Sequence, residues 1–434
     1  MTTVNCNSLL RQALAALTVS FVAISLGAAF GVMSGRGALP GILSAGVIAL
    51  IAAAFGGTRV QCSGPTAPMT ALMIVLVSAV GGGLLDGVPD ADPVRFINMV
   101  MLLTGALLIL AGALRLGRFI RLVPAVVISG FMNGIAVLIW LGESKALLGL
   151  GGKAPYSGGV PLNLLVALVT LALVFWLSSA LRRLDRRLAA LLPSTLVAII
   201  FMTALCSLLE LDIQRVTLGA SLSSFGDLQR MFLANVPTQW SAELVYLALP
   251  FALQLALLAY LDSLLTSLVV DQKYSALHGV EEMTRPNVEL RAQGVANGVV
   301  AFFGGIPGAQ ATIRSVLILN EGATRRIAGV LVGAFVLVEM LLCQDLVGLI
   351  PQAVFAGVLL KVGYDVFDWK TVAALLLRPQ RGTLRPGAIL FIAGTTAVTV
   401  FVDLSVAVIS FTVLFYIIRR WAAVELAEEA PDDR

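Results

Sequence analysis

The chain has few charged side chains. Of its 434 residues, 12% are Asp, Glu, Lys or Arg and 59% are hydrophobic, whereas a soluble domain carries about 25% charged residues. One histidine and four scattered cysteines exclude a histidine-rich metal site and a disulfide framework. No Walker A motif, Rossmann glycine motif or catalytic triad is present, so we expect neither ATP-driven transport, nor enzymatic activity, nor a cofactor. The net charge of +4 comes from loop arginines and does not indicate nucleic acid. The composition predicts a polytopic protein of the lipid bilayer.

Apolar segments predict an all-α fold with fourteen membrane spans. About 20 apolar residues cross the hydrocarbon core, and seven such segments fall in each half of the chain. They are 11–34, 38–56, 66–82, 97–114, 123–142, 161–180 and 190–209, then 244–270, 288–303, 311–322, 326–344, 351–364, 386–402 and 404–419. We therefore predict one transport domain over 1–420, with repeat 1 at about 11–209 and repeat 2 at about 244–419. A short acidic tail, 421–434, follows.

Loop charges predict that both termini are cytoplasmic, since cytoplasmic loops carry the excess of Lys and Arg. Every second loop is basic, whereas segment 83–96 is rich in Gly, Asp and Pro and segment 210–243 is mixed in charge. The basic loops contain Arg115, Arg118 and Arg121; Arg182, Arg183, Arg186 and Arg187; Lys273, Arg285 and Arg291; Arg325 and Arg326; and Lys370, Arg378, Arg381 and Arg385. The last span ends at Arg419 and Arg420. We expect a multi-pass protein of a bacterial inner membrane.

Two stretches interrupt the apolar pattern, one in each half: 62–68, with the sequence CSGPTAP, and 304–314, with the sequence GGIPGAQATIR. Non-helical backbone at membrane depth is tolerated only where protein or a polar cavity surrounds it. Paired interruptions are the best sequence pointer to a transporter binding site built from inverted repeats. We expect extended backbone leading into two half-helices whose N-termini meet at the midplane. Two helix N-termini would attract a small anion.

Polar residues at the predicted half-helix starts are candidates for that site. Thr66 and Thr312 hold corresponding positions in the two halves, and each could cap its helix or offer its hydroxyl to a ligand. Arg314 could raise the positive potential of the anion site, pair with an acidic group, or point to the inner vestibule. These alternatives stay open at the level of the sequence.

A carboxylate in the eighth span indicates a cation site. Asp262 costs about 2.5–3.5 kcal/mol at a helix centre, so it suggests a function by default. Thr266 is one turn further on, on the same face. Carboxylate and hydroxyl oxygens suit a small cation such as sodium. A protonatable carboxylate and a structural hydrogen bond are the alternatives.

Four motifs resemble the SulP inorganic anion transporters, also called the sulfate permease family. Residues 56–70 resemble that family's third span, 129–134 its fifth, 261–271 its eighth and 304–315 its tenth. The order of the motifs matches, and the resemblance covers nearly the whole chain. It implies a 7+7 inverted repeat with a core domain (spans 1–4 and 8–11) and a gate domain (spans 5–7 and 12–14). It also implies a homodimer that works by an elevator movement.

The eighth span is closest to the cyanobacterial sodium-dependent bicarbonate branch. That resemblance implies that Asp262 and Thr266 serve sodium, and that Thr66, Ala311 and Thr312 surround the anion. Two features depart from the family. We expect no STAS domain after the last span, and Gln310 and Arg314 stand where the bicarbonate branch has small residues. We assign Gln310 to both sites and Arg314 to the anion site, because a larger and more polar site favours sulfate or a carboxylate.

The sequence thus predicts secondary active transport of a small inorganic oxyanion, sulfate or bicarbonate, by sodium symport. A proton-coupled nucleobase or dicarboxylate symporter of the same 7+7 fold is one alternative, although nucleobase symporters typically carry a carboxylate on the tenth span, where this chain has Arg314. A passive anion channel is the other alternative. The cation site at Asp262 and Thr266 disfavours such an uncoupled pore.

Overall fold

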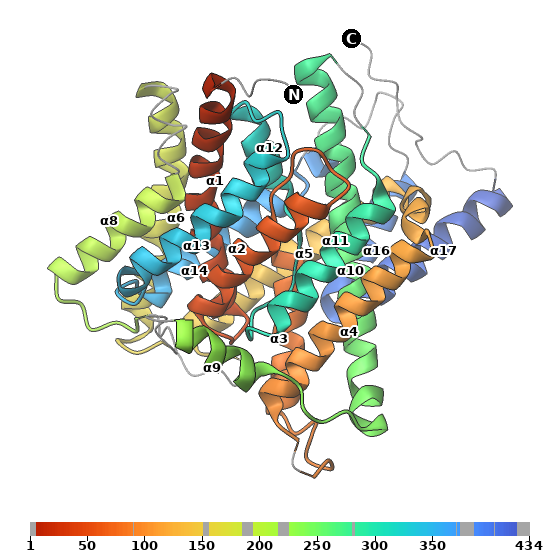
Figure 1. The fold of residues 1–434 in the computed structure, drawn as a ribbon, viewed down its shortest axis with the longest axis horizontal. Helices are drawn as coiled ribbons and strands as arrows, with labels where there is room; N and C mark the ends of the chain where they lie inside the picture. Colours follow the sequence, from red (N-terminus) through yellow and green to blue (C-terminus); the bar gives the residue numbers. More distant parts are fainter. Residues whose placement is uncertain are drawn as a thin grey trace. The chain divides into compact units, whose positions relative to one another are not determined.

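The computed structural model describes residues 6–89, 91–150, 156–184, 194–215, 225–279, 283–369, 371–373, 386–402 and 404–422. Several residues of the charge analysis lie outside this part: Asp90, Arg186, Arg187, Lys370, Arg378, Arg381, Arg385 and the predicted acidic tail after Ala422. The described part is mostly helical, as the composition predicts (Figure 1).

Helices occupy all fourteen predicted segments. In the first half they are α1 (Cys6–Met33), α2 (Ala38–Phe55), α3 (Ala67–Gly81), α4 (Pro93–Ala113), α5 (Ala125–Leu148), α6 (Val160–Leu184) and α8 (Ser194–Leu208). In the second half they are α10 (Ala242–His278), α11 (Pro286–Ala301), α12 (Thr312–Asn320), α13 (Ile327–Val347), α14 (Gln352–Val366), α16 (Pro386–Phe401) and α17 (Leu404–Ala422). Six helices of the described part are long and apolar enough to cross a membrane on their own.

Two helices of the described residues were not predicted. A 3₁₀ helix, η1 (Leu116–Leu122), follows α4, and α9 (Phe225–Asn235) lies in the segment predicted to be polar and mixed in charge. The ring of Phe232 in α9 lies 5.4 Å from that of Phe302 and 6.1 Å from that of Phe303. The apolar side of α9 therefore packs against the end of α11.

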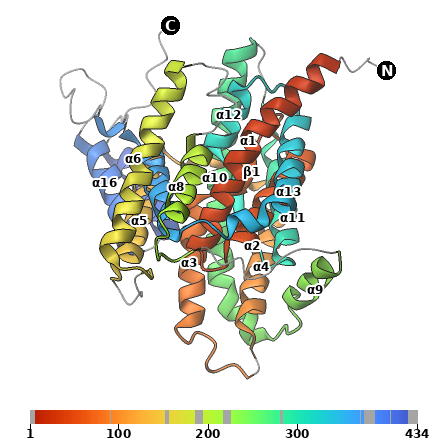
Figure 2. The ribbon, with the colours of Figure 1, turned by 90° about the vertical axis from the view of Figure 1, so that its left-hand side faces the viewer.

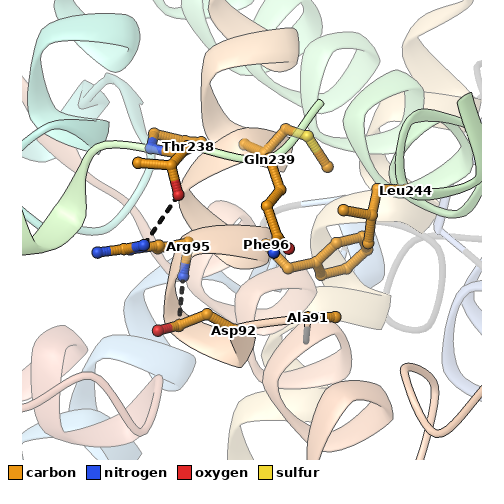
Figure 3. Close-up of a pocket in the computed structure, with 9 residues that line it drawn as sticks. Ala91, Asp92, Arg95, Phe96, Thr238, Gln239 and Leu244 are labelled. Atoms are coloured by element: carbon orange, nitrogen blue, oxygen red, sulfur yellow. Dashed lines mark hydrogen bonds between the residues drawn. The ribbon is translucent and has the colours of Figure 1, made fainter. Parts of the chain in front are cut away.

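Two helix boundaries differ from the predictions for reasons of capping. Helix α4 begins four residues before the predicted Ile97, because the Asp92 carboxylate accepts hydrogen bonds from the N–H groups of Val94 and Arg95 (Figure 3). A side-chain oxygen at this position satisfies N–H groups that a helix start leaves unpaired. Helix α10 continues past the predicted end at Val270 and stops at Gly279, which takes the left-handed conformation (φ 65°).

The chain divides into two compact units, residues 1–118 with 146–358, and residues 119–145 with 359–434. The first unit contains α1–α4 and α10–α13, the helices predicted for the core domain. It also contains α6, α8 and the N-terminal part of α14, up to Val358, which the sequence assigned to the gate domain. The division therefore departs from the prediction at these three helices, because α8 packs against both α1 and α6.

Helix α2 lies at the centre of the first unit. It contacts α1, α11 and α13 and both short strands, and the three neighbouring helices surround it in two perpendicular views (Figures 1 and 2). Its buried positions are mostly small residues, including Gly41, Ala45, Gly46, Ala49 and Ala52. Small residues let helix backbones approach closely, which favours association within a bilayer.

The two interrupted stretches form the short strands β1 (Ser63–Pro65) and β2 (Gly308–Gln310). They pair antiparallel with each other, with Ser63 opposite Gln310 and Pro65 opposite Gly308. The sequence predicted extended backbone at both places but not this pairing. Each strand leads into a short helix: α3 has 15 residues and α12 has nine. At 1.5 Å per residue these are about 22 Å and 14 Å long, too short to cross a core of about 30 Å.

Candidate functional site

The two half-helices meet the same face of α10. The Thr66 hydroxyl, at the start of α3, donates to the Asp262 carboxylate at 2.7 Å. The hydroxyls of Thr266 and Thr312, the latter in the first turn of α12, are 2.6 Å apart. Asp262 and Thr266 are four residues apart on α10, about one helical turn, so they share a face and lie about 6 Å apart along its axis. Four polar residues predicted from the sequence therefore form two hydrogen-bonded pairs along one face of α10.

Neither threonine caps its helix. Thr66 occupies the N-cap position of α3 but makes no side-chain capping bond, because its hydroxyl is directed to Asp262. The N-cap of α12 is Ala311, which has no side-chain oxygen, and Thr312 is the first residue of the helix. The capping role considered from the sequence is thus wrong for both residues. The first N–H groups of both half-helices have no intrahelical acceptor, so each end keeps its partial positive charge.

Close packing of the strands depends on glycine at two positions. A Cβ at Gly308 would lie 2.4 Å from the carbonyl of Gly64, so the strands could not approach as they do. Gly64 has φ +148° and its missing side chain leaves room for the Arg314 guanidinium, whose nitrogens lie 3.0 and 3.1 Å from the position of a Cβ. L-residues rarely adopt this backbone conformation.

Arg314 is a buried cation next to the site. Its side chain is 1% exposed, which excludes the inner vestibule considered from the sequence. Its Nη2 donates to the Pro65 carbonyl at 2.8 Å, which ties α12 to the end of β1. Its Nη1 is buried without a hydrogen-bond partner in the described part of the chain, although Asp262 lies within electrostatic range. A buried donor without a partner costs free energy, so Nη1 is suited to receive an anionic ligand.

Gln310 is fully buried at the end of β2. Its Oε1 accepts from the Thr58 hydroxyl at 3.3 Å, while its Nε2 has no partner among the described residues. Only its backbone N–H reaches α10, where it donates to Ser263. The assigned direct role of the Gln310 side chain in the cation site therefore has no supporting contact with Asp262 or Thr266.

A polar face of α11 holds both strands in place. Asn297 makes two hydrogen bonds to the backbone of Gly308 in β2, at 2.8 and 2.9 Å. One turn earlier, the Gln293 side-chain amide donates to Ser63 in β1 and to Glu289. These residues were not predicted from the sequence. Their spacing of four in an apolar segment was a signal that could have revealed them.

Glu289 organises the loop before β1. Its fully buried carboxylate accepts from the N–H groups of Gly57 and Thr58, at 2.7 and 3.0 Å, and from the Gln61 and Gln293 amides. A buried carboxylate with four donors is fully hydrogen-bonded and fixes the backbone around it. Glu289 is thus a structural support of the site and does not reach the face of α10.

Arg36, in the turn between α1 and α2, holds the loop that joins α11 to β2. Its guanidinium donates to the Gly304 carbonyl, at 2.8 and 3.1 Å, and to Asn98 at 2.6 Å. Burial lowers the pKa of Arg36 to about 10, an effect that nearby Asp92 partly opposes. Arg36 therefore stays charged at neutral pH and anchors the loop before the strand.

The oxygen atoms on α10 are suited to a hard monovalent cation. The Asp262 carboxylate and the Thr266 hydroxyl lie on one face, and the Thr66 and Thr312 hydroxyls contact them. Oxygen ligands of this type favour hard cations over transition metals. Within the described part of the chain, no cluster of three or more His, Cys, Asp or Glu residues is present.

A separate small cavity of about 40 Å³ lies between the start of α4 and the segment before α10. Arg95 lines it and donates to the Thr238 hydroxyl at 2.9 Å (Figure 3). Because the cavity is small and the Arg95 side chain is already hydrogen-bonded, we do not assign it to ligand binding.

Two half-helices that start at polar residues on one face of a third helix are typical of membrane transporters. The sequence profile of the sulfate permease family matches residues 9–379. The chain therefore belongs to the sulfate permease family, whose members are anion transporters and not enzymes.

Relatives and solved structures agree with this family. The bicarbonate transporter BicA of Picosynechococcus sp. is 32% identical over 90% of this chain and 67% of its own length. The putative sulfate transporter YvdB of Bacillus subtilis is 27% identical over 95% and 74%. The chain spans about two thirds of the length of the BicA relatives. The BicA transmembrane domain superimposes with a TM-score of 0.75 at 28% identity, covering 92% of this chain and 97% of that one.

Proposed function

We propose that this protein is a secondary active transporter that carries a small inorganic oxyanion, sulfate or bicarbonate, together with sodium. One observation carries the proposal: both half-helix N-termini contact one face of α10 beside the buried Arg314. The curated names of the relatives, a bicarbonate transporter and a putative sulfate transporter, support the substrate class.

The anion would bind where positive charge converges. The N–H groups at the starts of α3 and α12 have no side-chain cap, and the unpaired Arg314 Nη1 adds a full positive charge. Ala311 and Thr312 are half-buried, so the open side of this region lies at the start of α12. An oxyanion there would accept hydrogen bonds from backbone and guanidinium together.

The cation would act through the charge of Asp262. The carboxylate is bonded to the residue at which α3 begins, so its negative charge weakens the attraction of that helix end for an anion. Sodium on Asp262 and Thr266 would neutralise this charge. Anion and cation would then bind more tightly together than alone, which is the reciprocal coupling that symport requires.

We further propose a fourteen-span, 7+7 inverted repeat with both termini in the cytoplasm of a bacterium, and a homodimer that works by an elevator movement. Helices α3, α10 and α12 share hydrogen bonds at the site, so they would move together with the bound ions. The relatives BicA and YvdB come from bacteria, which supports the plasma membrane as the location.

Radiolabelled uptake into proteoliposomes tests the proposal. Sulfate and bicarbonate are compared with and without an inward sodium gradient, using protein-free liposomes as the control. We expect saturable uptake of one of the two anions, stimulated by sodium. Uptake that is indifferent to sodium would overturn the cation site, and no saturable uptake of either anion would overturn the substrate class.

A further inference from the structure

A basic cavity lies away from the central site, between the end of α4 and the start of α11. Its volume is about 580 Å³, within the range of roughly 300–1,000 Å³ that is typical of small-molecule sites. Three arginines line it: Arg115, Arg285 and Arg291. No carboxylate lines it among the described residues.

The guanidinium groups are available to a ligand. All three arginines are exposed. Among the described residues, Arg291 is the one of the three whose side chain makes a hydrogen bond: it donates to the Asn287 carbonyl at 3.2 Å. Like charges held around one cavity repel each other, so an anion between them would be stabilised by all three.

Arg115 occupies a position that favours glycine. It follows the C-cap of α4 with φ 58°, one of two non-glycine residues of the described chain with a positive φ. Glycine is the usual residue just after a helix end, and other residues pay a conformational cost there. The backbone alone therefore does not explain an arginine at this position.

The surroundings favour a lipid over a free anion. Leu110 on α4 and Leu114, just after the end of α4, are exposed before the cavity, as is Val295 on α11. Met283, which lines the cavity itself, is 70% exposed. Arginines at the end of an exposed apolar helix surface match a phosphate headgroup whose acyl chains run along the helices. Basic pockets between membrane helices commonly bind such headgroups.

We propose that this cavity binds the phosphate headgroup of an anionic phospholipid. The segment that lines it is also connected to the central site. The Arg285 N–H donates to the Gly57 carbonyl, and the Thr284 hydroxyl lies 3.1 Å from that of Thr58, which donates to Gln310. A bound lipid would therefore stabilise the loop that leads into β1.

Lipid titrations of the purified full chain test the proposal. Phosphatidylglycerol, phosphatidylcholine and inorganic phosphate are added separately, and binding is followed by native mass spectrometry and by the midpoint of thermal unfolding. We expect phosphatidylglycerol alone to bind and to raise the midpoint. Equal binding of phosphatidylcholine, or an equal effect of inorganic phosphate, would overturn the lipid assignment.

Variants locate the site. Arg115→Gln combined with Arg291→Gln should weaken phosphatidylglycerol binding by about fivefold for each arginine removed. Arg11→Gln combined with Arg325→Gln removes the same charge from exposed arginines elsewhere and should leave binding unchanged. An equal loss in both double variants would overturn the site, as would full binding in the first one.

Arg115→Gly separates the ligand from the fold. Glycine suits the left-handed conformation, so this variant should unfold at the same or a higher temperature without lipid. It should nevertheless bind phosphatidylglycerol about fivefold more weakly. Unchanged affinity would show that Arg115 takes no part in binding.

Discussion

At the scale of single residues, the site contains one half-buried negative charge and one buried positive charge with different partners. Asp262 is bonded to a threonine of the first half, and Arg314 donates to a backbone carbonyl that precedes that same threonine. Each charged side chain therefore contacts the start of α3. The two charges should affect different ions, and single substitutions can separate them.

Asp262→Asn should abolish the sodium dependence of uptake while the protein stays folded, because the amide keeps the shape and removes the charge. Uptake is measured in proteoliposomes at several sodium concentrations. Glu339→Gln is the matched control, since Glu339 is a second carboxylate within a helix, bonded to Ser20 and away from α10. Sodium dependence that survives in Asp262→Asn would show that the carboxylate is not the cation ligand.

Arg314→Gln should raise the KM for the anion by about tenfold to a hundredfold, the factor expected for losing a hydrogen bond to a charged group. Arg314→Lys keeps the charge and should restore part of the affinity. The readout is the concentration dependence of uptake, with thermal unfolding measured in parallel because Arg314 also holds Pro65. A KM that both variants leave unchanged would remove Arg314 from the anion site.

The residues of the site could be predicted from the sequence, but most of their contacts could not. Asp262, Thr266, Thr66 and Thr312 were predicted, and the structure joins them in two hydrogen-bonded pairs on α10. The Gln310 side chain instead accepts a hydrogen bond from the Thr58 hydroxyl. Residue spacing shows which side chains share a helix face, but it does not show which distant loop packs behind a strand.

At the scale of elements, two three-residue strands and one polar helix face hold the site. The strands are short, so few backbone hydrogen bonds join them, and side chains of α11 provide additional ones. The sequence predicted the extended segments from their Gly and Pro residues. It did not predict their pairing, because register between segments 245 residues apart leaves no local pattern.

Gly64→Ala should destabilise the fold by about 1–3 kcal/mol, because a side chain would strain a positive φ and crowd the Arg314 guanidinium. Gly81→Ala is the matched control, since nothing lies within 4 Å of a Cβ added at the end of α3. Thermal unfolding of the two variants is compared with that of the unsubstituted protein. Equal stability of both variants would contradict the close contact between β1 and Arg314.

Glu289→Ala should cost about 3 kcal/mol or more of stability, because several buried donors would lose their acceptor. Glu321→Ala serves as the control, because Glu321 is only half-buried. It occupies the C-cap position of α12, where its backbone N–H makes the capping bonds. Thermal unfolding is again the measurement. An equally small effect of both substitutions would mean that Glu289 is not a support of the β1 loop.

At the scale of the whole molecule, apolar segment length predicted the helices well. Capping shifted some of their ends, and α9 was missed because it is short, partly polar and outside the apolar runs. The division into units was predicted less well. It depends on how helices such as α6 and α8 pack, and segment order does not encode that.

The proposed topology places both termini on the cytoplasmic side. An epitope tag at either end should be cleaved by protease in inside-out vesicles and protected in right-side-out vesicles. The even number of spans requires the two tags to behave alike. Opposite behaviour of the two tags would mean that the number of spans is odd.

The most direct test of the central claim asks whether the transported anion binds at the start of α12. Ala311 is half-buried at that N-terminus, and Ala311→Cys adds a thiol there without removing a hydrogen-bonding group. The rate at which a water-soluble thiol reagent labels this variant is measured with and without saturating sulfate or bicarbonate. The protein that lacks the substitution is the control for labelling of the native cysteines. We predict that the transported anion slows the labelling of Cys at this position. Labelling that the same anion leaves unchanged, in a variant that still transports it, would contradict an anion site between the two half-helices.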